Sequence, residues 1–191
     1  DGLLLENNVF VGDTAGNYSS SDETRVVIAS ANATEDVGTV IRNNHIMGGS
    51  RGIHLEGPTS FEAGNIIEGN LIEKYNYAAV YLSDLSGFVV SGNTMYPRAN
   101  LPTSDAQSIY VSGTVNGGEI VKNTIVSDRR GSGVYLTDVK GGASPALVAN
   151  NFIYMGDVLS AAASRGVYIL SINSAGITVA NNSISLSSDH A

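Results

Sequence analysis

Apolar residues recur at fixed distances from a repeated asparagine along this chain. Seven times an asparagine is followed, two positions later, by a large apolar residue and is preceded, three positions earlier, by another apolar residue. The positions between are mixed, which is typical of short β-strands on either side of a bend and not of helices. The asparagines are Asn8, Asn44, Asn70, Asn93, Asn123, Asn151 and Asn182.

The spacing of these asparagines indicates a stack of coils. Successive asparagines are 36, 26, 23, 30, 28 and 31 residues apart, a period that favours a solenoid over a single compact core. The residue before the asparagine is glycine or asparagine in six of seven repeats. Both residue types tolerate the left-handed backbone that a sharp bend between strands requires. We therefore expect about seven coils, with the asparagines stacked inside.

A second pattern places one aromatic residue between two aliphatic residues, as in Gly133-Val134-Tyr135-Leu136. Side chains alternate along a strand, so the aliphatic residues should face the interior and the aromatic residue should face outward. Stacking the coils then predicts one external row, with Ile28 expected beside its first member. The row contains His54, Tyr81, Tyr110, Tyr135 and Tyr168.

The asparagine motifs resemble those of the right-handed parallel β-helix, the fold of the pectate-lyase-like superfamily, which has an internal asparagine ladder. The resemblance covers residues 1–191 as one all-β domain. The segment from Gly141 to Leu186 is most similar to the β-helix blocks of very large secreted bacterial cell-surface proteins. That similarity implies a secreted or cell-surface location and a scaffold, adhesion or glycan-contact role.

Composition narrows the range of partners. The chain has 18 acidic and 10 basic residues, which argues against nucleic acid and against anionic membranes. No run of apolar residues is long enough to span a membrane. The absence of cysteine excludes disulfides and thiolate metal sites. The sequence starts within a repeat and shows no capping segment, so we expect it to be part of a longer chain whose ends stack on further coils or on another chain.

The external row has two interpretations. Tyrosine forms strands well, and stacked aromatic residues stabilise neighbouring strands, so the row can be purely structural. It can also be a rigid amphipathic surface for an elongated ligand such as a polysaccharide, or for another surface protein. Three long connections (Gly12–Thr24, Tyr96–Gln107 and Tyr154–Arg165) are expected to leave one corner and to border this row.

Enzyme signatures are weak. Asp128, Arg129 and Arg130 form an acid–base cluster that could serve a polysaccharide lyase, which would need Ca²⁺ or another cation. Asp84 and Asp138 follow their strands at the same offset, but they lie two coils apart, too far for the carboxylate pair of a glycosidase. We expect no cofactor and no metal site, and we identify no catalytic residue. The preferred function is surface recognition or scaffolding through polysaccharide contact. The alternative is a lyase, a hydrolase or a phage tailspike-like depolymerase.

Overall fold

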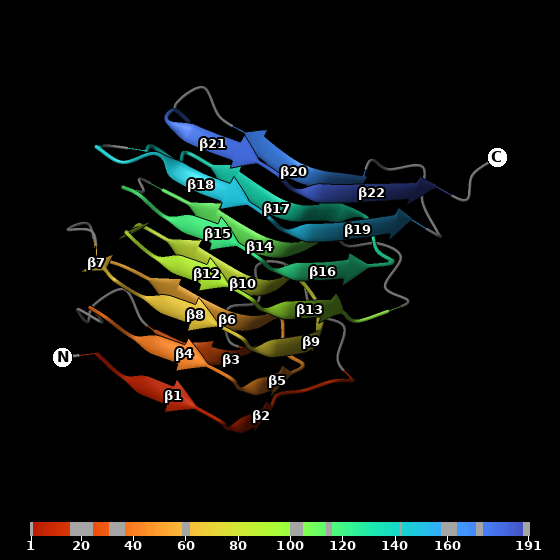
Figure 1. The fold of residues 1–191 in the computed structure, drawn as a ribbon. Helices are drawn as coiled ribbons and strands as arrows, with labels where there is room; N and C mark the ends of the chain where they lie inside the picture. Colours follow the sequence, from red (N-terminus) through yellow and green to blue (C-terminus); the bar gives the residue numbers. More distant parts are fainter. Residues whose placement is uncertain are drawn as a thin grey trace.

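Three long parallel sheets wind around one apolar interior in this computed structural model (Figure 1). The structure describes residues 2–15, 25–30, 37–58, 62–99, 105–113, 116–141, 143–157, 164–170 and 174–188. In these ranges every pairing between strands is parallel, and each strand of the three sheets pairs with the equivalent strand of each adjacent coil. The predicted parallel β-helix is confirmed.

The first and second sheets carry the two strands that flank each asparagine bend. The first sheet consists of β1 (Leu4–Glu6), β4 (Val40–Arg42), β8 (Ile66–Glu68), β12 (Val89–Ser91), β15 (Glu119–Val121), β18 (Ala146–Ala149) and β21 (Ile177–Ala180). The second consists of β2 (Val9–Val11), β5 (His45–Met47), β9 (Leu71–Tyr75), β13 (Thr94–Pro97), β16 (Thr124–Ser127), β19 (Phe152–Asp157) and β22 (Ser183–Ser188).

The third sheet carries the aromatic pattern and has one strand fewer. Its members are β3 (Val26–Ala29), β6 (Arg51–Glu56), β10 (Ala78–Ser83), β14 (Ala106–Ser112), β17 (Gly131–Thr137) and β20 (Ser164–Leu170). A short pair, β7 (Glu62–Ala63) with β11 (Leu85–Ser86), lies beside them. Six coils therefore contribute to all three long sheets, and the last contributes β21 and β22 to two, so the prediction of about seven coils is slightly high for complete coils.

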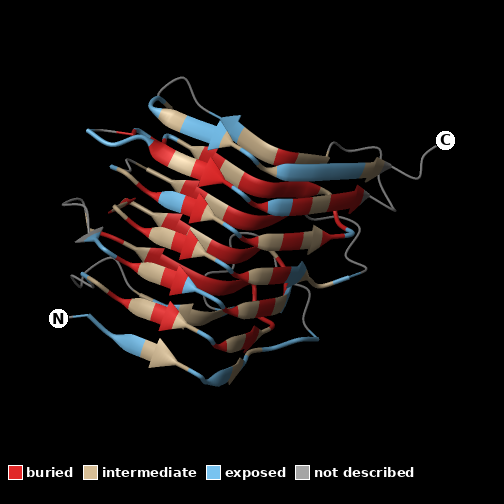
Figure 2. Ribbon diagram, viewed as in Figure 1, coloured by how far each residue is buried: buried red, intermediate tan, exposed pale blue. Residues whose placement is uncertain are grey.

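The interior consists of the apolar positions that the sequence pattern predicts to face inward. Ile41, Ile46 and Ile53 have no exposed surface, and equivalent residues of the next three coils are at most a few per cent exposed. Figure 2 shows this as bands of buried residue that run through the middle coils, while the first and last coils are largely exposed. Burial of these stacked aliphatic rows is the main stabilising contribution in such a fold.

The bend before each strand of the second sheet requires a left-handed residue. The residue that precedes the stacked asparagine has a positive φ in all seven repeats, between 54° and 63°. Asparagine and glycine occupy six of these positions, as the sequence suggested, and Lys122 occupies the seventh with a φ of 59°. A side chain without special left-handed preference is thus held in this conformation by the coils above and below it.

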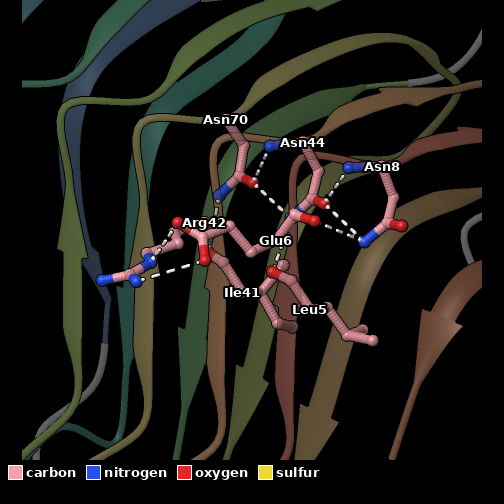
Figure 3. A network of polar contacts seen from close by, with 7 residues as sticks. All are labelled: Leu5, Glu6, Asn8, Ile41, Arg42, Asn44 and Asn70. Atoms are coloured by element: carbon pink, nitrogen blue, oxygen red, sulfur yellow. Dashed lines mark hydrogen bonds and ion pairs between the residues drawn. The ribbon is translucent and has the colours of Figure 1, made fainter.

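The asparagines at the bend form a continuous hydrogen-bonded row (Figure 3). The backbone N–H and Nδ2 of Asn44 both donate to Oδ1 of Asn70, at 2.9 and 3.1 Å, and Nδ2 also donates to the carbonyl of Leu5. Oδ1 of Asn44 in turn accepts from the backbone N–H and Nδ2 of Asn8. The same bonds link each asparagine to the next as far as Asn182. The row therefore has a direction, with donors pointing toward the C-terminal end.

Candidate functional site

The outer surface of the third sheet carries the aromatic row. Tyr81 pairs in register with Tyr110, Tyr110 with Tyr135, and Tyr135 with Tyr168, and we call these four residues the tyrosine row. All four are half-buried. The predicted row thus exists as a stack across four consecutive coils.

The N-terminal continuation of the row differs from the prediction by one residue. His54 lies in register beside Tyr81, and its other neighbour is Ala29, not Ile28. Ile28 instead pairs with Ile53 on the inward-facing side. The sequence pattern placed Ile28 outward because Val27-Ile28-Ala29 contains no aromatic residue that fixes the register.

The rings of the tyrosine row stack against one another. The ring centroids of Tyr81 and Tyr110 are 4.6 Å apart with planes 4° from parallel, and those of Tyr110 and Tyr135 are 4.9 Å and 14°. Tyr168 continues the row at 5.2 Å with its ring tilted by 58°. The flat faces of the central rings are therefore covered by their neighbours. Because strand side chains stand out from the sheet, the row presents ring edges and hydroxyl groups to its surroundings.

His54 closes one end of the row and is itself covered. Its ring packs edge-on against Tyr81 at 4.7 Å, and it is only 6% exposed. Nδ1 lies 3.1 Å from a terminal guanidinium nitrogen of Arg51, and Nε2 lies 3.7 Å from a carboxylate oxygen of Glu56. Direct contact of His54 with a large ligand would require these side chains to move.

Three further residues pack against the tyrosine row. The guanidinium of Arg51 lies 4.0 Å from the centroid of the Tyr81 ring, and that of Arg165 lies 4.2 Å from the Tyr168 ring. Tyr77 packs between Tyr81 and Tyr110, at 6.4 and 6.0 Å. Cation–π contacts of this kind hold each arginine over the ring. The sequence analysis did not identify Tyr77, Arg51 or Arg165.

A break in the alternation of side chains explains why these arginines were missed. Ala78 pairs with Gln107 and Val80 pairs with Ile109 in one constant register, whereas the ladder skips Ala79 and Ser108 between them. A Cβ on Gly52 would lie 2.7 Å from Ile72 Cγ2, and one on Gly133 would lie 2.5 Å from Ile153 Cγ2. The position of Gly52 and Gly133, two residues before the aromatic one, therefore faces inward. The position of Arg51 and Arg165, three residues before it, faces the aromatic side. Simple alternation predicts the opposite.

Three hydroxyl groups of the cluster, those of Tyr77, Tyr110 and Tyr135, hold their protons strongly. Burial raises the pKa of Tyr77 to about 12, with a further increase from Tyr81 and an opposing effect from Arg51. Burial and the neighbouring tyrosines raise the pKa of Tyr110 still further, and burial raises that of Tyr135. These three hydroxyl groups therefore stay neutral near pH 7, and each can donate one hydrogen bond and accept others.

The two arginines of the acid–base cluster at residues 128–130 bind different partners. Arg129 is 4% exposed, and one terminal nitrogen donates to the carbonyl of Asn76 at 2.7 Å. Burial lowers the pKa of Arg129. Nε of Arg130 forms an ion pair with Asp105 at 2.5 Å. The buried guanidinium of Arg129 thus serves the interior packing of the chain.

The two aspartates that follow the aromatic strands are turn residues. Asp84 and Asp138 have φ values of 54° and 53°, and Gly113 has a φ of 83° at the same offset in the coil between them. Each carboxylate accepts from the hydroxyl beside it, that of Ser83 at 2.9 Å and that of Thr137 at 3.4 Å. Aspartate tolerates the left-handed backbone, which accounts for its use here.

Two of the three long connections contact each other in the described residues. Arg98 donates from its guanidinium to the carbonyl of Ala15 at 2.8 Å, across 83 residues of sequence. This contact joins the connection of the first coil to that of the fourth. Residues 16–24, 100–104 and 158–163, the central parts of all three connections, lie outside the described residues.

Neither a metal-binding cluster nor a membrane-spanning helix occurs in the described part of the chain. Within it, no group of three or more histidine, cysteine, aspartate or glutamate side chains could hold a metal ion. The described residues likewise contain no helix long and apolar enough to cross a membrane.

Comparison with known proteins gives one family and one informative structure. Residues 6–155 match the family model described as periplasmic copper-binding protein NosD. No curated protein matches the sequence. The crystal structure of PfbA, a surface adhesin of Streptococcus pneumoniae, is similar with a TM-score of 0.63 and 17% identity, over 98% of this chain and 56% of that one.

A second structure of the same adhesin matches over 84% of this chain and 50% of that one, at 14% identity and a TM-score of 0.46. The chain therefore spans about half the length of the solved chains it matches. At these identities the likeness shows the fold alone. The predicted location, secreted or at the cell surface, is confirmed by the family, which is named for a periplasmic protein.

Proposed function

This chain belongs to the NosD family, and from that premise we propose that it is a recognition module outside the cytoplasm that holds an elongated polysaccharide along its tyrosine row. The observation that carries the proposal is the regular stack of four tyrosines, whose ring centroids are 4.6–5.2 Å apart. Along such a row, successive repeating units of a polymer can each contact an equivalent tyrosine.

The geometry favours hydrogen bonding over ring stacking as the mode of contact. The central ring faces are occupied by neighbouring rings, so a sugar cannot lie flat on them. The hydroxyl groups of Tyr77, Tyr110 and Tyr135 remain neutral because burial raises the pKa of each. A neutral phenol matches a sugar hydroxyl, which also both donates and accepts. The side chains are already ordered by their own stack, which lowers the entropy cost of binding.

Copper binding, which the family name suggests, does not fit the residues that the structure describes. The chain has no cysteine. His45 Nε2 lies 3.3 Å from Glu73 Oε1, and Met47 is nearby, which gives three donor types that copper accepts. The ammonium of Lys74, however, lies 3.9 Å from both the Met47 sulfur and Glu73 Oε1. A positive charge already stands where the cation would bind, so we assign no copper site.

Gel retardation against neutral and acidic polysaccharides, with and without Ca²⁺, tests the proposal. The variant Tyr110→Phe/Tyr135→Phe keeps both rings and removes two hydroxyls. Each neutral hydrogen bond contributes about 0.5–1.5 kcal/mol, so we expect affinity to fall roughly tenfold. Tyr96→Phe is the matched control, because Tyr96 is 40% exposed on β13 of the second sheet.

Three outcomes decide the proposal. Retardation of the wild type and of Tyr96→Phe, with loss in the double variant, supports the tyrosine row as the binding surface. Retardation that the double variant keeps would move the site elsewhere on the molecule. Shortening of any polymer during the assay would show that the protein is an enzyme and not only a recognition module, and the search for its active site would then turn to the long connections.

A further inference from the structure

The outward side of the second sheet carries a carboxylate that the fold does not use. Asp128 directly follows β16 and is exposed, and no hydrogen bond or ion pair joins its side chain to another described residue. Its neighbours Arg129 and Arg130 both have polar partners. The acidic member of the cluster at residues 128–130 is therefore available to a ligand.

Tyr154 brings a phenol to the same place from β19, the neighbour of β16 in the second sheet (Figure 1). Tyr154 and Gly156 both lie on the outward side of β19, because the alternate residues Ile153 and Met155 have no exposed surface. A Cβ built on Gly156 would lie 3.1 Å from Tyr154 Oη, 3.3 Å from Tyr154 Cε1 and 3.3 Å from Asp128 Oδ1. The Tyr154 side chain therefore leans along its own strand, and its hydroxyl end and the Asp128 carboxylate converge on Gly156.

Gly156 lacks the side chain that would separate these two groups. Ser127 pairs with Met155, so the next residues, Asp128 and Gly156, lie side by side. Gly156 is buried, whereas Tyr154 is half-buried and Asp128 is exposed. The phenol and the carboxylate thus cover Gly156 and remain accessible on their other sides.

The rings on β19 differ from the tyrosine row in having no stacked neighbour. No ring contact joins Tyr154 or Phe152 to another described aromatic residue. Phe152 lies two positions before Tyr154 on the same side of the strand and is 47% exposed. An apolar group can therefore stack on these rings, which the central rings of the tyrosine row do not allow.

A neutral sugar unit uses all of these features. A sugar ring has an apolar face of C–H groups, which can pack on an aromatic ring, and hydroxyl groups at its rim. Those hydroxyls can donate to the Asp128 carboxylate, which only accepts, while the Tyr154 hydroxyl can both donate and accept. The same carboxylate repels an acidic sugar. A basic side chain would match the carboxylate and a ring, but it would leave the donor of Tyr154 unused.

We propose that Asp128, Tyr154 and Phe152 form a second sugar-binding site, which holds one neutral sugar unit by stacking and by hydrogen bonds to the carboxylate. The site lies on the second sheet, so binding there does not require the tyrosine row of the third sheet. It gives the chain a second point of contact with a glycan, of a different kind from the first.

Saturation-transfer NMR with methyl glycosides of neutral hexoses and N-acetylhexosamines tests this site, with Nα-acetyl-lysine amide as a cationic probe. We expect transfer to at least one glycoside and none to the lysine derivative. Asp128→Asn should weaken binding of that glycoside roughly tenfold, because a neutral amide replaces a charged acceptor. Tyr154→Ala with a native circular dichroism spectrum should abolish binding. Glu119→Gln is the matched control, because Glu119 is an exposed carboxylate on β15 of the first sheet.

The variant Tyr110→Phe/Tyr135→Phe separates this site from the tyrosine row and should keep the signal. A signal that both Asp128→Asn and Tyr154→Ala keep would overturn the proposal, and its loss in the tyrosine-row variant alone would assign the sugar to that row. Transfer to the lysine derivative and to no glycoside would overturn the proposal in favour of a basic partner. Absence of transfer to every probe would also overturn it, while gel retardation of polymers would still decide the function of the tyrosine row.

Discussion

Replacing one central asparagine of the stacked row should destabilise the whole chain. Asn93 has no exposed surface. Its Oδ1 accepts from both the backbone N–H and Nδ2 of Asn70, and its Nδ2 donates to the carbonyl of Ile67 and to Oδ1 of Asn123. Asn93→Ala would leave two buried donors of Asn70 and the carbonyl of Ile67 without these partners.

The magnitude follows from the number of groups left without a partner. A buried polar group without its hydrogen bond costs about 1–3 kcal/mol, so two or three such groups give a loss of roughly 3–6 kcal/mol in the free energy of unfolding. Asn8→Ala is the matched control. Asn8 is exposed in the first coil, and its bonds to Glu6 and Asn44 lie near solvent, so its loss should cost less than about 1 kcal/mol.

Urea denaturation followed by circular dichroism measures this difference. We expect the midpoint of Asn93→Ala to fall well below that of Asn8→Ala, with a similar dependence on urea where both unfold in one transition. Equal midpoints for the two variants would refute the reasoning, because buried and exposed members of the row would then contribute alike.

Two further predictions concern the third sheet. Gly133→Ala should lower the free energy of unfolding by about 1–3 kcal/mol through overpacking, since the added Cβ would lie 2.5 Å from Ile153 Cγ2 and 2.8 Å from the Gly166 carbonyl; thermal unfolding checks this, and an unchanged midpoint would contradict it. The pKa of Tyr77, raised from 10.0 to about 12, means that the folded state holds this proton more tightly than the unfolded state. The contribution of Tyr77 to the free energy of unfolding is therefore complete below pH 10 and is lost between pH 10 and 12. Tyr77→Phe should reduce the pH dependence of the free energy of unfolding in that window. An unchanged profile would contradict the prediction.

The inward rows were predictable from the sequence because they depend on periodicity alone. Apolar residues at fixed distances from Asn44, Asn70 and the other asparagines specify the strands and their register, and the glycine or asparagine before them specifies the bend. The outward position of Tyr81, Tyr110 and Tyr135 followed from alternation within each strand.

The details of the candidate site depend on features that periodicity does not contain. The break in alternation that places Arg51 and Arg165 on the same side as the tyrosines is recognisable only from the close approach of Gly52 to Ile72 and the equivalent approaches, which join distant parts of the sequence. Tyr77 precedes β10, so the alternation of side chains within that strand does not predict which side the Tyr77 ring faces. The stacking of the rings results from side-chain rotamers that adjacent coils impose on each other, and the burial of His54 results from its neighbours Arg51 and Tyr81.

Calorimetric titration with a length series of one binding oligosaccharide tests the central claim most directly. The tyrosine row spans three steps between coils, roughly 14–15 Å at the spacing of neighbouring strands. If the row is the binding surface, affinity should increase with each added sugar until the ligand covers Tyr81 to Tyr168, and should then level off. In Tyr110→Phe/Tyr135→Phe that increase should largely disappear. An affinity that does not depend on ligand length, or a length dependence that the double variant keeps, would contradict the account.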